Sequence, residues 1–214
     1  MITLKIDPKV IQHFLKLNTD ELTPAINQQE LSARRYKGKR YTGLILQDNA
    51  IQTGPPLQRC PHFRGTLQRV EQGLEWNQTE YKSLFNTWYT KMNGGKYQHS
   101  SFDDFYQHRL KEWDDIFNDI KVNGFKESKP KRDNIEVAMN NSGQILLIDG
   151  RHRLAFAQTL GLKNIPVVVN ILSESMAHAF AKSAPQLTKQ LQSNTIQRLT
   201  YARRQALAHK SRKH

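Results

Sequence analysis

Five consecutive residues, Asp149-Gly150-Arg151-His152-Arg153, have the types and spacing of an anion-binding turn. They follow a predicted strand at 144–148 and open a predicted helix at 151–160. The first turn of a helix has unpaired backbone N–H groups and a partial positive charge, which attract phosphate. A glycine lets the backbone approach a ligand closely, and the three basic side chains add positive charge. We therefore predict a phosphate-binding site here, for a nucleotide.

Three further roles follow from side chains in or near this turn. Asp149 can hold Mg²⁺ through oxygen or accept a proton from an attacking hydroxyl, and His152 can orient or deprotonate that hydroxyl. Glu136 alternates with apolar neighbours in a predicted strand, so it is a catalytic base if its face lines the pocket and an exposed strand residue if not. Lys131 lies in a basic loop that either closes over the nucleotide or is simply solvated.

A purely structural interpretation of the turn is also open. Asp149 could be no more than a helix N-cap, and Arg153 could pair with a carboxylate in the core. Arg109 with Asp114 or Asp115 is interpreted in the same way, as a structural ion pair. The eight histidines lack familiar metal-ligand spacing, so we expect no transition-metal site. A single cysteine excludes an internal disulfide.

The net charge of +13 favours a polyanionic partner. From residue 174 to 214 the chain has eight Lys or Arg and one acidic residue. This basic segment is interpreted as a solvated helical extension or as a contact for nucleic acid or a membrane. No apolar stretch is long enough to cross a bilayer, and the first eight residues do not resemble a secretory signal, so we expect a cytoplasmic protein.

The first part of the chain is expected to contain little regular structure. Residues 2–6 alternate as a strand, and residues 8–17 predict a helix. From 19 to 61 the Gly and Pro residues predict a loop, with one possible strand at 44–46. Within that loop, residues 34–41 interleave cations with aromatic residues, which suits anion binding with stacking or a solvated surface loop.

Helices are expected from residue 61 onwards. The spacing of apolar residues predicts helices over 62–72, 79–92 and 101–122, the last with an aromatic stripe that packs on the core. Two more are expected at 174–184 and 187–210. The first three helices end at Gly residues, as helices commonly do, and Pro185 separates the last two.

Between these helices the apolar period changes to that of strands. Strands are predicted at 135–139, 144–148 and 164–171, with a turn at 140–143. We therefore predict an α+β fold. Residues 1–172 form a domain with a helical insertion at about 61–124, and residues 173–214 form a basic helical extension.

Residues 149–157, followed by Leu160-Gly161-Leu162 and Ile165-Pro166-Val167, resemble the central motif of the ParB/sulfiredoxin superfamily. The helix at 115–124 also fits, so the similarity covers roughly 113–170. The resemblance implies a small mixed sheet surrounded by helices.

This superfamily contains several activities. ParB proteins bind CTP and carry a DNA-binding helix-turn-helix, whereas sulfiredoxin uses ATP through a cysteine in its turn. Free-serine kinases use ATP or ADP and carry an Asp-Gly-His-His-Arg turn. The turn here has no cysteine, which excludes sulfiredoxin chemistry, and it is most similar to that of the serine kinases. The resemblance implies that Gly150, Arg151, His152 and Arg153 hold nucleotide phosphates, and that Asp149 serves Mg²⁺ or the acceptor hydroxyl.

Residues 73–81 and 109–110 are similar to ParB-like proteins of surface-polysaccharide gene clusters. The leading hypothesis is a kinase with Mg²⁺ and ATP or ADP as cofactors. Its acceptor would be a small hydroxylated molecule such as a sugar, a glycan precursor or an amino acid. The alternatives are a ParB-like DNA-binding or CTP-binding protein without kinase activity, and a nucleotide-binding regulator.

Overall fold

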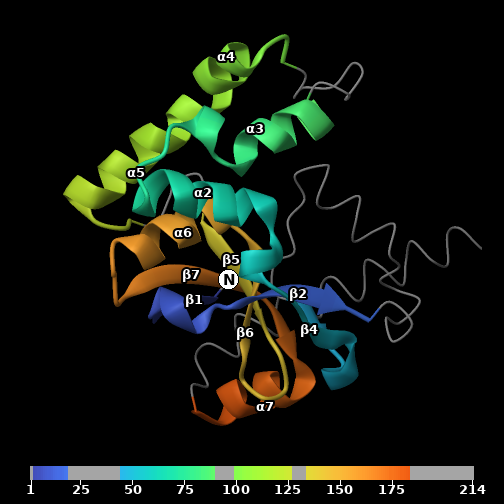
Figure 1. The fold of residues 1–214 in the computed structure, drawn as a ribbon. Helices are drawn as coiled ribbons and strands as arrows, with labels where there is room; N and C mark the ends of the chain where they lie inside the picture. The colour runs from blue at the N-terminus through green and yellow to red at the C-terminus, as the bar shows by residue number, and fades with distance from the viewer. Residues whose placement is uncertain (1, 19–43, 90–98, 127–133, 184–214) are drawn as a thin grey trace, which may run out of the picture.

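The computed structural model describes residues 2–18, 44–89, 99–126 and 134–183, which form a mixed α+β fold (Figure 1). Seven strands make one sheet in the order β1-β7-β5-β6-β2-β4, and β3 also pairs with β7. The sheet contains parallel and antiparallel pairs, so the predicted α+β class is confirmed at this level. The strands are β1 (Ile2–Ile6), β2 (His13–Leu17), β3 (Leu44–Leu46), β4 (Ile51–Pro56), β5 (Ile135–Met139), β6 (Ile145–Asp149) and β7 (Ile165–Ser173).

Strand β7 makes the most long-range pairings. Along one edge it runs parallel to β5. Along the other edge, residues 165–169 pair antiparallel with β1, and residues 171–173 pair in parallel with β3. Every residue of β7 except Pro166 is buried. A nearly continuous apolar sequence is typical of a strand covered on both faces.

A hairpin joins β5 to β6, as the sequence predicts. The Asn140 side chain accepts hydrogen bonds from the backbone N–H groups of Ser142 at 3.2 Å and Gln144 at 2.9 Å. Gly143 has a φ of 79°, which a side chain would disfavour. The pairing of the two strands places Asp149 opposite Glu136. The hairpin thus sets where β6 ends and where the turn from Asp149 to Arg153 begins.

The helices form two layers over one face of the sheet (Figure 1). Helices α2 and α6 lie against the sheet, and α3, α4 and α5 lie over them. Helix α7 follows β7 directly and contacts β7 and β3. The helices are α2 (Pro61–Glu71), α3 (Glu80–Leu84), α4 (Phe102–Phe105), α5 (Lys111–Asn123), α6 (Arg151–Thr159) and α7 (Glu174–Ser183).

Helix α6 is buried between the sheet and the outer helices. Leu154, Ala155 and Ala157 belong to the apolar cluster that includes residues of β5, β6 and β7. Phe156 belongs to the second cluster, with Trp113 of α5 and the other aromatic residues of the outer layer. All four residues from 154 to 157 are buried. The small alanines let α6 pack closely on the sheet, which holds its first turn in a fixed place.

One helical segment runs from Phe102 to Asn123. It passes from α4 through a π-helical turn at Tyr106–Leu110 into α5. Ser101 Oγ accepts the backbone N–H of Asp104 at 3.0 Å, which caps the start. Gly124, with a φ of 74°, ends the segment. The predicted start and stop are confirmed, whereas the π-helical turn was not expected.

The prediction of one helix over 8–17 is wrong. Pro8–Val10 form a short 3₁₀ turn, and His13–Leu17 are strand β2. Strands β4 and β6 pair with β2 on its two edges and satisfy its backbone. A short apolar run does not reveal by its period whether it is a buried strand or a helix, so these distant partners decide the structure.

Residues 51–56 form β4 instead of the loop that their Gly and Pro residues predict. Strand β4 is the last in the sheet order, and an edge strand tolerates proline because one side needs no ladder hydrogen bonds. A Cβ at Gly54 would lie 2.5 Å from the carbonyl oxygen of Phe14, so only glycine fits beside β2. The suggested strand at Leu44–Leu46 is confirmed as β3.

Several sequence predictions fall outside the residues that the structure describes. These are the basic and aromatic run at 34–41, the loop with Lys131, and the helix at 187–210. The boundary between residues 172 and 173 stays a prediction. No helix in the described ranges has the length and hydropathy needed to cross a bilayer.

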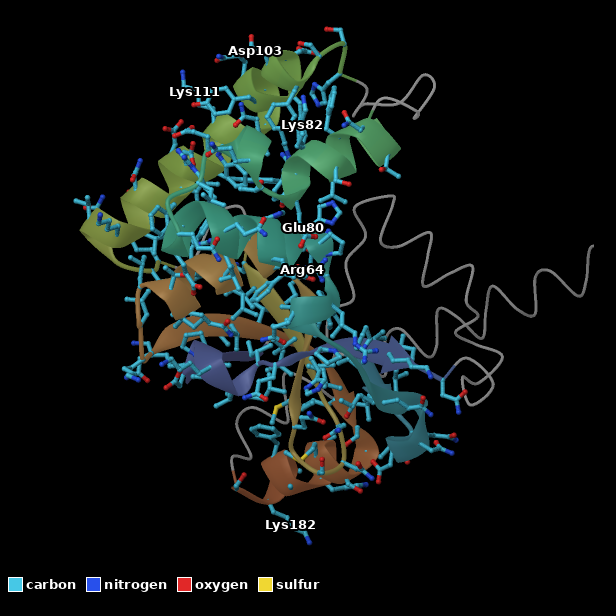
Figure 2. All side chains as sticks on the ribbon, viewed as in Figure 1. Arg64, Glu80, Lys82, Asp103, Lys111 and Lys182 are labelled. Carbon is cyan, nitrogen blue, oxygen red and sulfur yellow. The ribbon has the colours of Figure 1, made fainter. Side chains whose placement is uncertain are left out.

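Polar side chains join the two helical layers. Arg69 of α2 donates to both carboxylate oxygens of Asp114 on α5, at 3.1 and 3.2 Å. The indole N–H of buried Trp76 donates to the same carboxylate at 3.0 Å. Similarly, Arg64 on α2 forms an ion pair with Glu80 at the start of α3, with Nη2 2.7 Å from Oε2 (Figure 2). The contacts of Asp114 position α5, which carries one wall of the site described below.

Asp114→Ala should lower the free energy of unfolding by about 2–4 kcal/mol, because Arg69 and the Trp76 indole would lose their shared acceptor. Urea denaturation measures the change. Glu112→Ala on the same helix is a matched control, since its carboxylate is 60% exposed and lies 3.3 Å from Arg109. That substitution should cost less than about 0.5 kcal/mol. Equal losses in the two variants would contradict the role given to Asp114.

Candidate functional site

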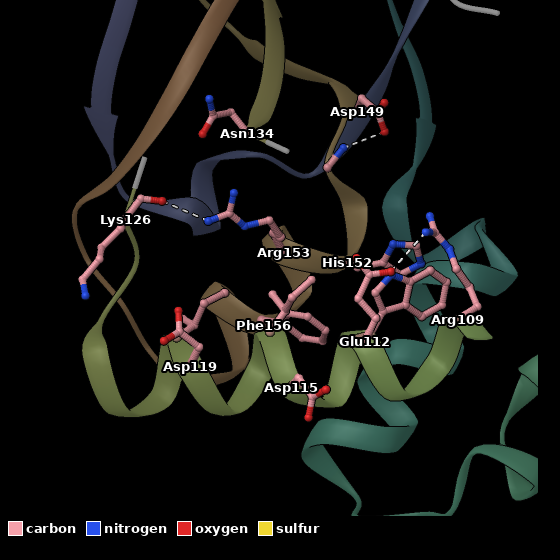
Figure 3. A pocket seen from close by; sticks show the side chains of 14 residues that line it. Arg109, Glu112, Asp115, Asp119, Lys126, Asn134, Asp149, His152, Arg153 and Phe156 are labelled. Atoms are coloured by element: carbon pink, nitrogen blue, oxygen red, sulfur yellow. Dashed lines mark hydrogen bonds and ion pairs between the residues drawn. The ribbon is translucent and has the colours of Figure 1, made fainter. Parts of the chain in front are cut away.

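A cleft of about 600 Å³ opens between α5, the first turn of α6 and the end of β6 (Figure 3). Its size suits a small organic ligand. In Figure 3, Asn134 and Asp149 lie across the cleft from α5, and Arg153 extends between them toward Lys126. The lining residues are Arg109, Glu112, Trp113, Asp115, Ile116, Asp119, Ile120, Lys126, Asn134, Asp149, Gly150, His152, Arg153 and Phe156.

Gly150 forms the bend between β6 and α6. Its φ of 88° lies in the left-handed region, and it occupies the N-cap position of α6. A Cβ at this position would lie 2.8 Å from Cα of Ile135 and 3.0 Å from the carbonyl oxygen of Asn134. The close packing of the bend on β5 therefore requires glycine. The bend also sets the direction of α6. The first backbone N–H groups of this helix lack acceptors within the helix and face this end of the sheet.

Asp149 lines the cleft directly before that bend. Its Oδ1 accepts the backbone N–H of Gly150 at 2.8 Å, which helps to fix the carboxylate beside the turn. The side chain is otherwise exposed. Carboxylate oxygen is the ligand that Mg²⁺ prefers, so this residue type and position suit the predicted metal role.

Arg153 is the cation of the turn that reaches the cleft. Its Nη2 donates to the carbonyl oxygen of Lys126 at 2.9 Å, and its guanidinium lies 4.4 Å from the ring centroid of Phe125. Stacking and the carbonyl contact restrict the side chain, and a planar guanidinium can still offer several N–H groups to a phosphate. Lys126 itself also lines the cleft.

His152 lines the cleft and is enclosed by aromatic side chains. Its Nε2 lies 2.6 Å from the hydroxyl of Tyr81, and its ring stacks on Trp113 with centroids 3.7 Å apart. The Tyr81 hydroxyl donates to the carbonyl of His62 at 3.2 Å. These two contacts hold the Tyr81 hydroxyl between the His62 carbonyl and the His152 ring.

The environment keeps His152 neutral. Burial holds its pKa well below the ordinary value, and the nearby Arg151 lowers this pKa further. Burial also lowers the pKa of His62 to about 4, with a smaller contribution from Arg151. A neutral imidazole supplies no positive charge to a phosphate. The arrangement therefore favours His152 as a hydrogen-bonding and positioning group.

The remaining predicted site residues are not gathered at the cleft. Arg151 donates to Cys60 Sγ at 3.8 Å, toward the start of α2, and does not line the cleft. Glu136 is 6% exposed and accepts a hydrogen bond from Asn170 at 2.8 Å. Strand alternation directs Glu136 away from the face on which its neighbours Ile135 and Val137 meet α6. Lys131 lies outside the described residues.

The structure adds site residues that the sequence analysis did not assign. Glu112, Asp115 and Asp119 border the cleft along α5 at a spacing that places them on one side of the helix. Arg109 also lines the cleft, and it pairs with Glu112 instead of the predicted Asp114 or Asp115. The helical spacing of these acids was readable in the sequence. What they face was not, because α5 and the functional turn meet only in the folded chain.

The side chains that line the cleft have a less positive net charge than the chain as a whole. Among the residues that the structure describes, three cations line the cleft, Arg109, Lys126 and Arg153, against four carboxylates, Glu112, Asp115, Asp119 and Asp149. With His152 neutral the lining has a net charge of −1, although the whole chain has +13. A bare polyphosphate would be repelled by several of these groups. A polyphosphate that carries a divalent cation fits this charge balance better.

Comparison with known proteins does not name a family. No protein-family model, curated protein or solved structure matches the chain. The resemblance to the ParB/sulfiredoxin superfamily therefore rests on the motif alone, and function has to be argued from the cleft and its residues.

Proposed function

We propose that this protein is a nucleotide-dependent phosphotransferase of the ParB/sulfiredoxin-like type. It would transfer a phosphoryl group from ATP or ADP to a hydroxyl of a small acceptor. The observation that carries the proposal is the position of the turn from Asp149 to Arg153. The N-terminus of a nine-residue helix, a glycine required by close packing, a carboxylate and an arginine meet at one end of a cleft of about 600 Å³.

The phosphates would bind at the first turn of α6. Backbone N–H groups and the helix dipole favour an anion there, and Arg153 adds charge-assisted hydrogen bonds. Mg²⁺, held by Asp149 and the phosphates, would offset the phosphate charge. The net charge of −1 in the cleft lining supports a requirement for this cation.

The acceptor would lie between the phosphates and α5. Exposed Glu112 and Asp119 border that side of the cleft, and their carboxylates accept hydrogen bonds from hydroxyl or ammonium groups. A sugar, a glycan precursor such as those of polysaccharide biosynthesis, or an amino acid fits this lining better than an apolar acceptor.

In the reaction, the acceptor oxygen forms a bond to the terminal phosphorus. The bond from that phosphorus to the bridging oxygen breaks, and the shorter nucleotide leaves. The hydroxyl proton is released to solvent, since Asp149 holds Mg²⁺ in this scheme. His152 would orient the reacting groups through its hydrogen bonds, held by Tyr81 and Trp113. Glu136 has no part in this scheme, since it is buried away from the cleft.

Arg153→Ala should weaken nucleotide binding about 10–100-fold, because charge-assisted hydrogen bonds to phosphate would be lost. The measurement is calorimetric titration with ATP, ADP, CTP and GTP, with and without Mg²⁺. Arg59→Ala is the matched control, since Arg59 is exposed and does not line the cleft. Circular dichroism would verify that both variants fold.

Each result of this titration has a defined meaning. Binding of ATP or ADP that needs Mg²⁺ and is weakened only in Arg153→Ala would support the proposal and justify screening hydroxylated acceptors. Absence of nucleotide binding, or equal binding in the wild type and Arg153→Ala, would contradict it.

A second candidate function is a ParB-like DNA-binding or CTP-binding protein. The observation that favours it is the net charge of +13, half of which lies in the last 41 residues. CTP-selective binding in the same titration would move the assignment to this candidate. Binding to duplex DNA that weakens steeply with salt would be the next measurement.

A further inference from the structure

Contrary to the expectation from histidine spacing, we propose a second ligand site, for a divalent transition metal such as Zn²⁺, formed by His99, Asp104 and His108. One ligand atom from each residue lies within 4.8 Å of the others. His108 Nδ1 lies 2.7 Å from Asp104 Oδ1, and His99 Nδ1 lies 3.4 Å from Asp104 Oδ2. The two imidazoles thus converge on one carboxylate. No residue of this group lines the cleft described above.

The backbone holds these three residues together. Asp104 and His108 are four residues apart in one helical segment, so their side chains share a face, as pairs of zinc ligands on a helix do. His99 comes from the residues just before this segment. Ser100 donates its backbone N–H to Asp104 Oδ2 at 2.9 Å, and Ser101 caps the helix start. These contacts hold the carboxylate and keep His99 close to the first helical turn.

The two histidine side chains differ in exposure, and this difference suits metal binding. The His99 side chain is 12% exposed and its ring lies 5.1 Å from the Phe105 ring, so its position is fixed by packing. The His108 side chain is 69% exposed and can rotate. Zinc bonds to nitrogen or carboxylate oxygen are about 2.0–2.2 Å, so ligand atoms around one ion lie roughly 3–4 Å apart. A small rotation of the His108 ring would bring the group within this range.

The donor set selects the kind of metal. Two imidazoles and one carboxylate suit Zn²⁺, Ni²⁺, Cu²⁺ or Fe²⁺, whereas Mg²⁺ prefers oxygen ligands. This site is therefore chemically distinct from the Mg²⁺ role proposed for Asp149. Three protein ligands with one of them exposed leave a coordination position open to water. The π-helical turn Tyr106–Leu110 contains His108, and such turns are frequent at functional sites.

The test is titration of the untagged full-length protein with Zn²⁺ alone, followed by calorimetry. We expect one ion per chain at this site, with affinity reduced at least about tenfold in His108→Ala and in His99→Ala. His178→Ala is the matched control, because His178 is an exposed histidine on α7 that belongs to no group of this kind in the described chain. It should bind Zn²⁺ as the wild type does.

A second readout separates metal binding from a structural effect of the substitutions. Zn²⁺ should raise the melting temperature of the wild type and of His178→Ala but not that of His108→Ala, since a ligand stabilises only the state that binds it. Because His108 is exposed, its replacement should leave the fold intact. Wild-type affinity for Zn²⁺ in His108→Ala, or no saturable binding to the wild type, would overturn the proposal. Neither result would affect the nucleotide titration, which uses a different part of the molecule.

Discussion

Gly150→Ala should lower the free energy of unfolding by about 2–5 kcal/mol and abolish nucleotide binding. Two separate effects lower the free energy of unfolding at this position, and they add. A left-handed backbone costs a residue with a side chain about 1–2 kcal/mol, and overpacking against fixed neighbours costs about 1–3 kcal/mol more. Here the neighbours are backbone atoms of Ile135, the first residue of β5, and of Asn134 before it, 2.8 and 3.0 Å from the added Cβ. Chemical denaturation measures the first effect and calorimetric titration with nucleotide the second.

Gly161→Ala separates the two costs. Gly161 has a φ of 63°, but a Cβ there would meet nothing within 4 Å. The substitution should therefore show only the backbone cost of about 1–2 kcal/mol, and it should leave nucleotide binding unchanged. If both variants lose the same stability, the contact between the turn and β5 is not what requires glycine at residue 150.

Acid should destabilise the protein between about pH 6.5 and pH 4. His62 has a pKa of about 4 in the folded chain, against 6.5 for an ordinary histidine, and burial is the main cause. As the pH falls through 6.5, the unfolded chain takes up a proton that the folded chain does not, so stability falls. The loss continues until the folded pKa is reached and amounts to at most about 3 kcal/mol for His62, less what solvent screening removes. His152 acts in the same direction.

Urea denaturation at several pH values between 7.5 and 5 would measure this loss. Most carboxylates titrate below that range, so the histidines should dominate the slope. His62→Gln should make the slope shallower by up to one proton. His178→Gln, at an exposed position, should leave the slope as it is in the wild type. A free energy of unfolding that does not change over this range would contradict the buried, neutral state of the two histidines.

The features that the sequence predicted well are those that depend on near neighbours in the chain. Ser101 and Gly124 mark the start and end of a helical segment because caps act within one turn. The hairpin turn at Asn140 follows from side-chain hydrogen bonds within four residues. In each case the physical cause lies within a few residues.

The features that the sequence predicted poorly depend on distant partners. Strand β2 was predicted as a helix because its partners, β4 and β6, begin about 38 and 132 residues later in the chain. The contacts of the cleft residues were equally hard to predict, because they also depend on distant parts of the chain. Trp113 was interpreted as core packing, and it does pack in the core, but its ring also stacks on His152 and lines the cleft. The acids of α5 acquire a role only because α5 lies across from the turn.

The pairing of β7 with three other strands has a consequence for the order in which the protein can fold as it is made. Strands β1, β3 and β5 all leave the ribosome before residues 165–173, which are the partner of each. Until β7 is made, the edges of these strands that pair with β7 have no partner. Only the hairpin of β5 with β6 and the pairs made by β2 can form at that stage. A nascent chain that stops before β7 should therefore be a substrate for chaperones and proteases. Addition of these nine residues should convert it into a folded protein.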